Sequence, residues 1–418
     1  MNYNTIISER QDRGEVFTPI TLVEEMLDKL PKEVFESKTT TFLDPCFGTG
    51  SFLRTIGLRL KAAGHSSENI NSRLFGFEVD SRMFNETKAR MPYINISKED
   101  FLKADINMKF DVIVGNPPYQ SSDERRDGAI WPEFIKIGIK HLNENGYISF
   151  LTPSSWAADT SNKVLTFEST ATVSGLKGLM LKHLDLTHLT FGKKVNDYFN
   201  VGADISFFIG VKCKSNHLTE LSTNSGILRL NLNDYDFIPV NINKNIISIL
   251  EKTIFSKNYF EILHGTYKLR VKNTNTTSTE CNSEFKWKFA NTSAKYSKGI
   301  YGYSNYKTEH HDKPKVVWSN SGYNKPFSDD GNIGLGDHTK AIQLPLNKHE
   351  SLIWYLENSK LIKFLSSMKN VGGYVIGYSV ISECLPKIEL RNSIDDNYIY
   401  TQLNLTQEEI DYIENAVK

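Results

Sequence analysis

The run Asn116-Pro117-Pro118-Tyr119, directly after the apolar stretch 110–114, has the residue types that most directly suggest chemistry. Two consecutive prolines remove two amide donors and stiffen the turn, which indicates a backbone held in one conformation. An exocyclic amine on an aromatic ring is a poor nucleophile because its lone pair is delocalised. The side-chain oxygen of Asn116 and the carbonyl of Pro117 can accept its two hydrogens and localise that lone pair, while Tyr119 offers a stacking surface. The pattern predicts in-line methyl transfer to a planar nitrogen, with positioning as the main source of catalysis.

A glycine-rich turn, Asp44 to Gly50, follows another short apolar run and precedes a helical pattern. Gly48 and Gly50 let the backbone approach a ligand closely and permit positive φ. The turn has neither the spacing of a dinucleotide-binding motif nor the lysine of a phosphate-binding loop. An acid such as Asp44 suits a cationic ligand, so the turn predicts the sulfonium and amino acid part of S-adenosylmethionine. An ordinary tight turn between strand and helix is the alternative.

Two further acids follow strand-like runs in order along the chain. Glu78 ends the run 74–77, where an acid can bind both ribose hydroxyls of an adenosine. Asp100 follows the third such unit and can accept a hydrogen bond from the adenine amino group, with Phe101 packing on the purine. Each acid alone is also explained as a solvated loop carboxylate, but their succession favours a cofactor site.

The elements that must position these residues alternate between short apolar runs and helical patterns from about residue 13 to residue 153. Near-continuous apolar strands separated by helices predict a parallel sheet covered on both faces. Ligands of such sheets bind outside the carboxyl ends of the strands. We predict strands over 41–43, 74–77, 110–114, 147–151 and 201–211, and helices over 21–30 with Thr21 as its N-cap, 51–63, 132–142, 246–255 and 350–368.

Composition limits the classes of protein that the chain can represent. Its 418 residues, with 39% hydrophobic content, suffice for two domains. Lys+Arg and Asp+Glu both number 49, so a basic surface for nucleic acid must be local. Four scattered cysteines suggest neither a zinc site nor a disulfide framework, and no apolar run approaches a membrane span. We therefore expect no metal, no membrane association and a cytoplasmic location.

The second half of the chain has a different composition. Residues 252–330 contain thirteen Lys and Arg against seven Asp and Glu, interleaved with aromatic residues. Positive charge neutralises phosphates and aromatic rings contact bases, so the segment predicts a nucleic-acid-binding surface. The candidate DNA contacts are Lys286, Trp287, Lys288, Lys313 and Lys315. A solvated basic surface is the alternative for any one of them.

In their order the motifs resemble gamma-type N6-adenine-specific DNA methyltransferases, of the restriction-modification or phage type. The resemblance covers the first half of the chain closely and the second half only by position and character. It rests on Gly14–Pro19 for the N-terminal cofactor motif, Asp44–Gly50 for the glycine-rich motif, Phe77–Val79 for the ribose motif, Asp100–Phe101 for the adenine motif, Asn116–Tyr119 for the catalytic motif, and Leu151–Trp156 and Tyr198–Gly202 for later segments.

The resemblance implies an α/β fold. It implies a Rossmann-like S-adenosylmethionine-dependent methyltransferase domain over 1–240 and a C-terminal α+β, β-rich target-recognition domain over 241–418. By resemblance, Phe199 makes a second contact to a flipped-out adenine in duplex DNA. The residues implied in cofactor binding are Thr18, Pro19, Asp44, Cys46, Gly48, Gly50, Glu78, Val79, Asp100, Phe101, Asn116 and Pro118. One residue departs from the family: Phe47 stands where a small residue or Cys is usual, so its side chain must point away from the cofactor.

Other functions share the catalytic motif. Methylation of a glutamine amide in a protein, or of guanine in ribosomal RNA, poses the same lone-pair problem, but the extra mass here is C-terminal, basic and aromatic. A non-catalytic DNA-binding protein with a methyltransferase fold is a further alternative, which the intact Asn116 and acids disfavour. A fused nuclease is disfavoured because Glu284-Phe-Lys286 lacks an upstream acidic partner. We expect a monomer, encoded by a bacterium or phage, with any cognate endonuclease as a separate chain.

Overall fold

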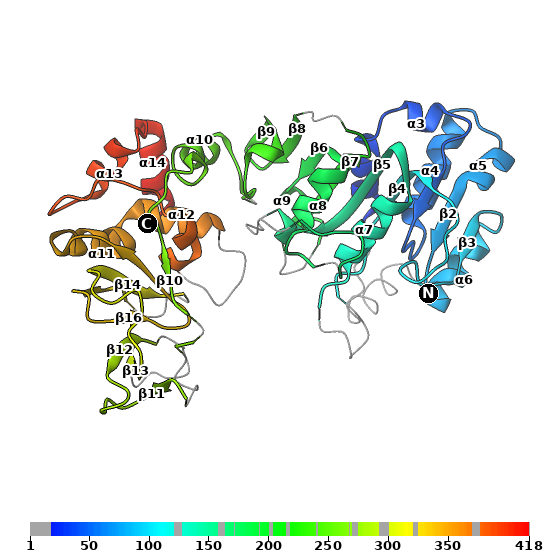
Figure 1. Ribbon diagram of the computed structural model, residues 1–418. Coiled ribbons are helices and arrows are strands. Elements are labelled where there is room, and N and C mark those ends of the chain that lie inside the picture. Colours follow the sequence, from blue (N-terminus) through cyan, green and yellow to red (C-terminus); the bar gives the residue numbers. More distant parts are fainter. Residues whose placement is uncertain are drawn as a thin grey trace. The chain divides into compact units, whose positions relative to one another are not determined.

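The computed structural model divides into two compact units, Met1–Asn243 and Lys244–Lys418 (Figure 1). The structure describes residues 18–120, 128–157, 164–170, 172–191, 193–199, 204–214, 218–239, 241–266, 268–269, 275–291, 301–320, 325–369 and 377–417. Of the predicted N-terminal motif, residues 14–17 lie outside these ranges, as do residues 200–202 after Phe199.

The first unit is built on a nine-stranded sheet in the order β3-β2-β1-β4-β5-β7-β6-β8-β9. The pairs from β3 to β5 are parallel, whereas β7 is antiparallel to both β5 and β6. The expected α/β, Rossmann-like fold is therefore confirmed, although the sheet is mixed rather than parallel throughout. The strands are β1 Phe42–Asp44, β2 Leu74–Phe77, β3 Asn95–Ser97, β4 Phe110–Gly115, β5 Leu142–Pro153, β6 Asp185–Thr190, β7 Ile205–Val211, β8 Thr219–Thr223 and β9 Gly226–Leu230.

Helices cover both faces of this sheet. Alternate residues of β4, β5 and β7 form one core cluster with apolar residues of α2 and α4. On the other face α7 packs so closely that a Cβ at Gly138 would lie 2.9 Å from Ile148 Cδ1. The helices are α2 Ile20–Asp28, α3 Glu33–Glu36, α4 Ser51–Ala62, α5 Ser67–Arg73, α6 Ser81–Arg90, α7 Trp131–His141, α8 Leu176–His183 and α9 Lys193–Asn196, with short 3-10 turns at Ser154–Trp156 and Leu232–Asp234.

The first helix begins earlier than the sequence predicts. Its N-cap is Pro19, whose carbonyl oxygen accepts the amides of Leu22 and Val23, so Thr21 lies inside the first turn rather than capping it. Proline suits this position because its fixed φ matches the start of a helix. Thr18 and Pro19, both partly buried, therefore lie where the chain enters α2.

The second unit joins two four-stranded sheets to a group of helices. The sheets have the orders β10-β17-β14-β15 and β11-β13-β12-β16, and a small core of Val317, Leu335 and Ala341 lies among their strands. The strands are β10 Leu263–His264, β11 Thr277–Ser278, β12 Trp287–Ala290, β13 Tyr301–Ser304, β14 Lys315–Ser319, β15 Phe327–Asp329, β16 Gly334–Leu335 and β17 Thr339–Gln343. The helices are α10 Lys244–Lys252, α11 His349–Asn358, α12 Lys360–Lys369, α13 Asp396–Gln402 and α14 Gln407–Ala416, with 3-10 turns at Ile254–Ser256, Leu346–Lys348 and Gly377–Cys384.

Candidate active site

Strand order places the two main motifs side by side. β1 lies between β2 and β4 in the sheet. After β1 the chain continues to β2 on one side, and after β4 it continues to β5 on the other side, so it leaves β1 and β4 in opposite directions. Such a switch point in a parallel sheet opens a crevice at the carboxyl ends of the strands. Asp44 ends β1 and Gly115 ends β4. The glycine-rich turn and the turn Asn116–Tyr119 therefore begin at the same edge.

The two turns are in direct contact. The thiol Sγ of Cys46 donates a hydrogen bond to the backbone carbonyl of Asn116 over 3.3 Å. A Cβ at Gly115 would lie 2.9 Å from Asp44 Oδ1 and 3.4 Å from Pro45 Cδ. Residue 115 must therefore be small for the acid and the catalytic turn to approach each other this closely.

Asp44 is a carboxyl group held out of water. It is 1% exposed, and its Oδ1 accepts the amide of Cys46 over 3.2 Å. Burial raises the pKa of Asp44 to about 8, with the nearby Glu78 adding to the rise. A buried acid of this kind gains from a cationic neighbour, because the neighbour stabilises its charged form.

Glu78 anchors the glycine-rich turn to the end of β2. Its Oε2 accepts the amide of Gly48 and its Oε1 accepts the amide of Asp80, both over 2.8 Å. A carboxylate can accept about four hydrogen bonds, so Glu78 keeps capacity for a ribose hydroxyl beside its backbone amides. The neighbouring Val79 is 64% exposed, so an apolar surface stays open beside the acid.

The side chain of Phe47 points away from this edge, as the departure from the family requires. It is 4% exposed and belongs to the core cluster on the α4 face, with its ring centroid 6.3 Å from that of Phe84. A Cβ at Gly76 of β2 would lie only 2.7 Å from Phe47 Cδ1. The bulk of Phe47 is therefore accommodated by a glycine in the neighbouring strand.

Two glycines give the turn its shape. Gly48 and Gly50 have φ values of 51° and 76°, which residues with side chains rarely adopt. Thr87 of α6 donates its hydroxyl to the carbonyl of Gly48 over 3.2 Å, and its methyl group would be 2.9 Å from a Cβ at Gly50. Sequence reasoning missed Thr87 because an isolated threonine in a helix carries no signal of such a contact.

The two predicted adenine contacts, Asp100 and Phe101, differ in how exposed they are. Asp100 stays partly accessible, although its carboxylate accepts the amide of Leu102 and pairs with Lys103 over 3.1 Å. Phe101 is 2% exposed and packs between Phe77 and Phe134. Phe101 is therefore a core residue in contact with aromatic neighbours, and its contact with the purine stays a prediction.

The turn Asn116–Tyr119 has a graded exposure. Pro117 is buried and Pro118 is exposed, and the amide of Ile130 donates to the carbonyl of Tyr119 over 3.2 Å. Burial raises the pKa of the Tyr119 hydroxyl above its ordinary value, so the ring stays neutral. Tyr119 and Phe199 are both partly buried and pack against the same core cluster. The two aromatic residues therefore pack on the same face of the sheet.

The predicted DNA contacts lie in the second unit, and one of them is wrong. Lys315 is fully buried, where it forms an ion pair with Asp329 and donates to the carbonyls of His310 and Lys313. The sequence gave no warning of this, because every residue of β14 is buried and a lysine at the start of such a strand looks like any other lysine of the basic segment. Lys313 stays partly exposed.

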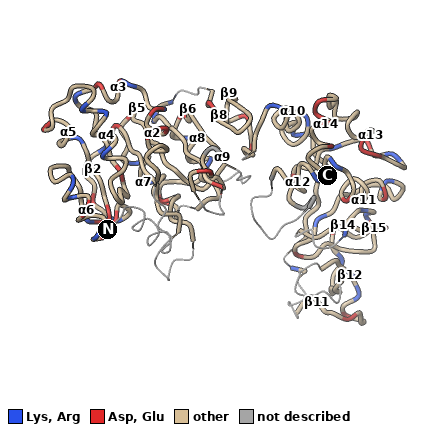
Figure 2. Tube along the Cα trace, turned by 180° about the vertical axis from the view of Figure 1, so that it is seen from behind, with Lys and Arg blue, Asp and Glu red and all other residues tan. Residues whose placement is uncertain are grey.

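The remaining candidates gather around β12 and β13. Lys286 and Lys307 lie over the ring of Trp287, at 5.6 Å and 5.2 Å from its centroid. Lys288 lies 3.8 Å from the ring centroid of Tyr301. We call these five residues the β12 surface. Elsewhere Lys and Arg are interspersed with Asp and Glu along both units (Figure 2).

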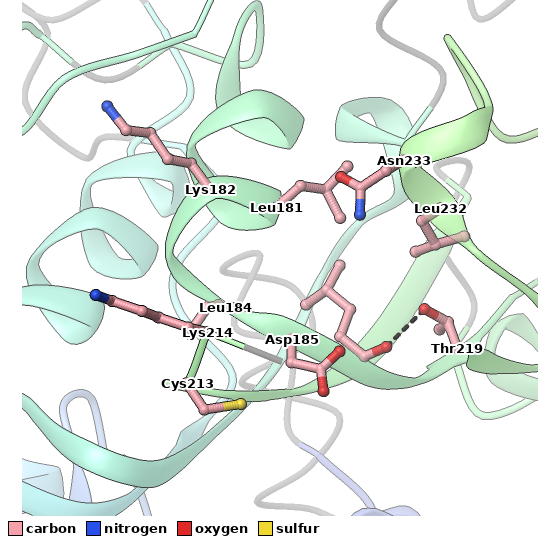
Figure 3. Close-up of a pocket in the computed structure, with 10 residues that line it drawn as sticks. Leu181, Lys182, Leu184, Asp185, Cys213, Lys214, Thr219, Leu232 and Asn233 are labelled. Carbon is pink, nitrogen blue, oxygen red and sulfur yellow. Dashed lines mark hydrogen bonds between the residues drawn. The ribbon is translucent and has the colours of Figure 1, made fainter. Parts of the chain in front are cut away.

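A separate small pocket lies at the opposite edge of the sheet (Figure 3). It is lined by Asp185 at the start of β6, by Cys213 after β7 and by Thr219 at the start of β8. Since β6 is parallel to β8 and β7 runs against both, these residues are at the end away from the glycine-rich turn. The pocket contains none of the motif residues.

Comparison with known proteins finds similarity to restriction-modification methyltransferases. Residues 58–172 match the model described as the Eco57I restriction-modification methylase. A type II methyltransferase, M.VspI, from Vibrio sp. is 29% identical over 172 residues, which are 36% of this chain and 40% of that protein. M.CvrRI from Paramecium bursaria Chlorella virus XZ-6E is 31% identical over 158 residues, 35% of this chain and 38% of the relative.

A protein methyltransferase also matches. The release factor glutamine methyltransferase of Fusobacterium nucleatum is 27% identical over 177 residues, 37% of this chain and 48% of that protein. The chain thus spans about two fifths to a half of the length of these relatives. Each of these three relatives matches little more than a third of this chain.

The sheet order and these matches together confirm the predicted resemblance to restriction-modification methyltransferases over the matched segment. They also imply S-adenosylmethionine as the cofactor. The site fits this cofactor, because it offers a buried acid for positive charge at Asp44, a hydrogen-bond acceptor for ribose at Glu78 and an open apolar side chain at Val79.

Two features are absent from the residues that the structure describes. Among those residues, no group of three or more His, Cys, Asp and Glu side chains is arranged to hold a metal ion. No helix that the structure describes is long and apolar enough to cross a membrane.

Proposed function

We propose that this protein transfers a methyl group from S-adenosylmethionine to the N6 amino group of an adenine in duplex DNA. One observation carries the proposal: the cofactor turn and the amine-binding turn touch each other at the switch point, through the 3.3 Å contact from Cys46 Sγ to the Asn116 carbonyl. Methyl transfer requires the donor and the acceptor nitrogen to lie within one crevice, and this contact brings their two binding turns together.

The residues of the catalytic turn bind and orient the amine. S-adenosylmethionine, when bound, supplies an electrophilic methyl group. Asn116 Oδ1 and the Pro117 carbonyl accept the two amino hydrogens, which localises the lone pair on nitrogen. Tyr119 and Phe199 hold the ring by stacking, which contributes about 1–3 kcal/mol per base in other proteins. The adenine leaves the base stack to reach the turn, because its nitrogen is inaccessible inside the duplex.

The β12 surface supports DNA as the substrate class. Its three lysines lie on aromatic rings, an arrangement that combines phosphate neutralisation with a face for bases. The same unit holds the excess of thirteen basic over seven acidic residues in 252–330. A glutamine amide substrate needs no such surface, so we favour DNA over the activity that the Fusobacterium relative's name describes. A monomeric state and a separate endonuclease stay predictions.

The acceptor can be identified by label transfer. S-adenosylmethionine with a tritiated methyl group is incubated with the protein and, separately, with duplex DNA, ribosomal RNA or release factor. We expect label in DNA, recovered as N6-methyladenine after digestion to nucleosides. Label in the release factor or in RNA, with none in DNA, would contradict the proposed substrate.

A further inference from the structure

The strongest unassigned contact of the site is the one that Cys46 makes. Resemblance to the family places Cys46 near the methionine part of the cofactor. In the structure its Sγ donates to the backbone carbonyl of Asn116 over 3.3 Å, while its amide donates to Asp44 Oδ1 over 3.2 Å. The residue is therefore fixed at its backbone by the cofactor turn and bonded at its side chain to the catalytic turn.

We infer that Cys46 is a positioning residue that sets the direction of the Pro117 carbonyl through its hydrogen bond to the Asn116 carbonyl. The inference rests on the proposed function, since the Pro117 carbonyl matters only if it accepts an amino hydrogen. It gives Cys46 a role toward the acceptor that is distinct from the cofactor contact implied by resemblance.

Backbone geometry explains how a thiol bonded to the preceding carbonyl controls the carbonyl of Pro117. The bond to the Asn116 carbonyl fixes the plane of the peptide between Asn116 and Pro117, because a peptide unit is planar. The ring of Pro117 locks its φ near −65°. Its ψ is the one soft dihedral left, and the following Pro118 confines it to the extended range. Once the peptide plane is held, the Pro117 carbonyl has nearly one direction.

Packing keeps the thiol in place. Gly115 has no side chain, which leaves room for Asp44. The glycine-rich turn can therefore approach the turn Asn116–Tyr119 closely. Burial, with Asp44 and Glu78 nearby, raises the pKa of the Cys46 thiol well above its ordinary value. The thiol thus keeps the hydrogen that it donates.

Three substitutions separate this role from others. Cys46→Ala removes the donor, Cys46→Val removes it but keeps most of the volume, and Cys46→Ser restores a donor. Cys213→Ala, at the opposite edge of the sheet, is the control for loss of a thiol. For each variant we would measure the single-turnover rate of methyl transfer to duplex DNA and, by calorimetry, the affinity for S-adenosylhomocysteine.

We expect Cys46→Ala and Cys46→Val to slow transfer by about 2- to 13-fold, the effect of losing one hydrogen bond. Affinity for S-adenosylhomocysteine should change less than about 3-fold, and Cys46→Ser should recover most of the rate. Unchanged rates in the Ala and Val variants would overturn the inference. It would also be overturned by a rate that follows cofactor affinity alone, or by a serine variant as slow as alanine. If Cys46→Ala does not fold, the Val and Ser pair decides.

A second readout does not depend on the identity of the substrate. The S–H stretching band of Cys46, isolated by subtracting the infrared spectrum of Cys46→Ala from that of the wild type, should lie below the band of a thiol without a hydrogen bond. A band at the free-thiol position would overturn the inference. If the wild type methylated no DNA, the proposed function would fail, and this band would still test the hydrogen bond.

Discussion

At the scale of single residues, Asp44 can be recognised in the sequence, and its burial as a charged group costs free energy. An acid at a strand end before a glycine-rich turn is visible in the sequence, as are Glu78 and Asn116. What the sequence cannot show is which side chains touch, because contacts such as Cys46 to Asn116 join residues 70 apart along the chain. Phe101 shows this limit most clearly, because the motif order predicts a ligand contact but does not show that the ring packs near Phe77 and Phe134 in the core.

The raised pKa of Asp44 predicts a pH-dependent stability. The pKa of Asp44 is about 8 in the folded protein and near 3.8 in the unfolded chain. Between these values the folded state keeps a proton that the unfolded state has lost. Stability of the ligand-free protein should therefore fall as pH rises from about 4 to about 8, with a slope of at most ~1.4 kcal/mol per pH unit from this group.

The substitution Asp44→Asn isolates this effect, because asparagine can still accept the Cys46 amide but carries no charge. Denaturant unfolding at pH 5, 6.5 and 8 should show the stability of the Asp44→Asn variant gaining on that of the wild type as pH rises. A difference between the two proteins that stays constant over this range would show that Asp44 is ionised when folded.

At the scale of elements, strands with continuous apolar runs were predictable and their order was not. β2 occupies the predicted residues, and β1, β4, α4 and α7 agree within one or two residues. β6, β8 and β9 were missed, and the reversed direction of β7 could not be seen, because period and propensity report burial rather than neighbours. The close packing of Phe47 against Gly76 also belongs to this scale, because it joins the glycine-rich turn to β2.

Gly76→Ala tests the close packing of Phe47 against Gly76. Its Cβ would meet Phe47 Cδ1 at 2.7 Å and Leu53 Cδ1 at 3.1 Å, so we expect a loss of about 1–3 kcal/mol of folding stability, typical of overpacking. The matched control is Gly57→Ala in α4, whose nearest atom lies at 3.6 Å and which should be neutral or stabilising.

A double mutant gives the decisive comparison for this pair. In a Phe47→Ala background the clash is removed, so Gly76→Ala should cost clearly less than it does in the wild type. Equal costs in the two backgrounds, measured by urea unfolding, would mean that Phe47 does not determine the requirement for glycine at 76.

At the scale of the whole molecule, composition predicted a basic, aromatic second half but could not say which lysines face solvent. Lys315 and Lys286 are indistinguishable by type, yet one is buried against Asp329 and the other is exposed. Burial follows from the pairing of β14 between β15 and β17, which no local pattern encodes.

The β12 surface predicts a salt-dependent affinity for duplex DNA. Lys286→Ala and Lys288→Ala should each weaken DNA binding at all sequences and reduce the slope of log K against log salt by about 1. Lys363→Ala, an exposed lysine on α12, is the control and should leave the slope unchanged. Slopes equal to the wild type in all three variants, measured by fluorescence anisotropy, would place the DNA contacts elsewhere.

Asn116→Ala tests whether the turn after β4 carries out methyl transfer next to the glycine-rich turn. We expect single-turnover transfer to duplex DNA to fall on the order of 10²-fold or more, as for loss of one hydrogen-bonding group that acts on the transition state. Affinity for S-adenosylhomocysteine should stay within about 3-fold of the wild type. If Asn116→Ala transferred the methyl group at the wild-type rate, Asn116 would have no part in the reaction and the proposed role of this turn would be wrong.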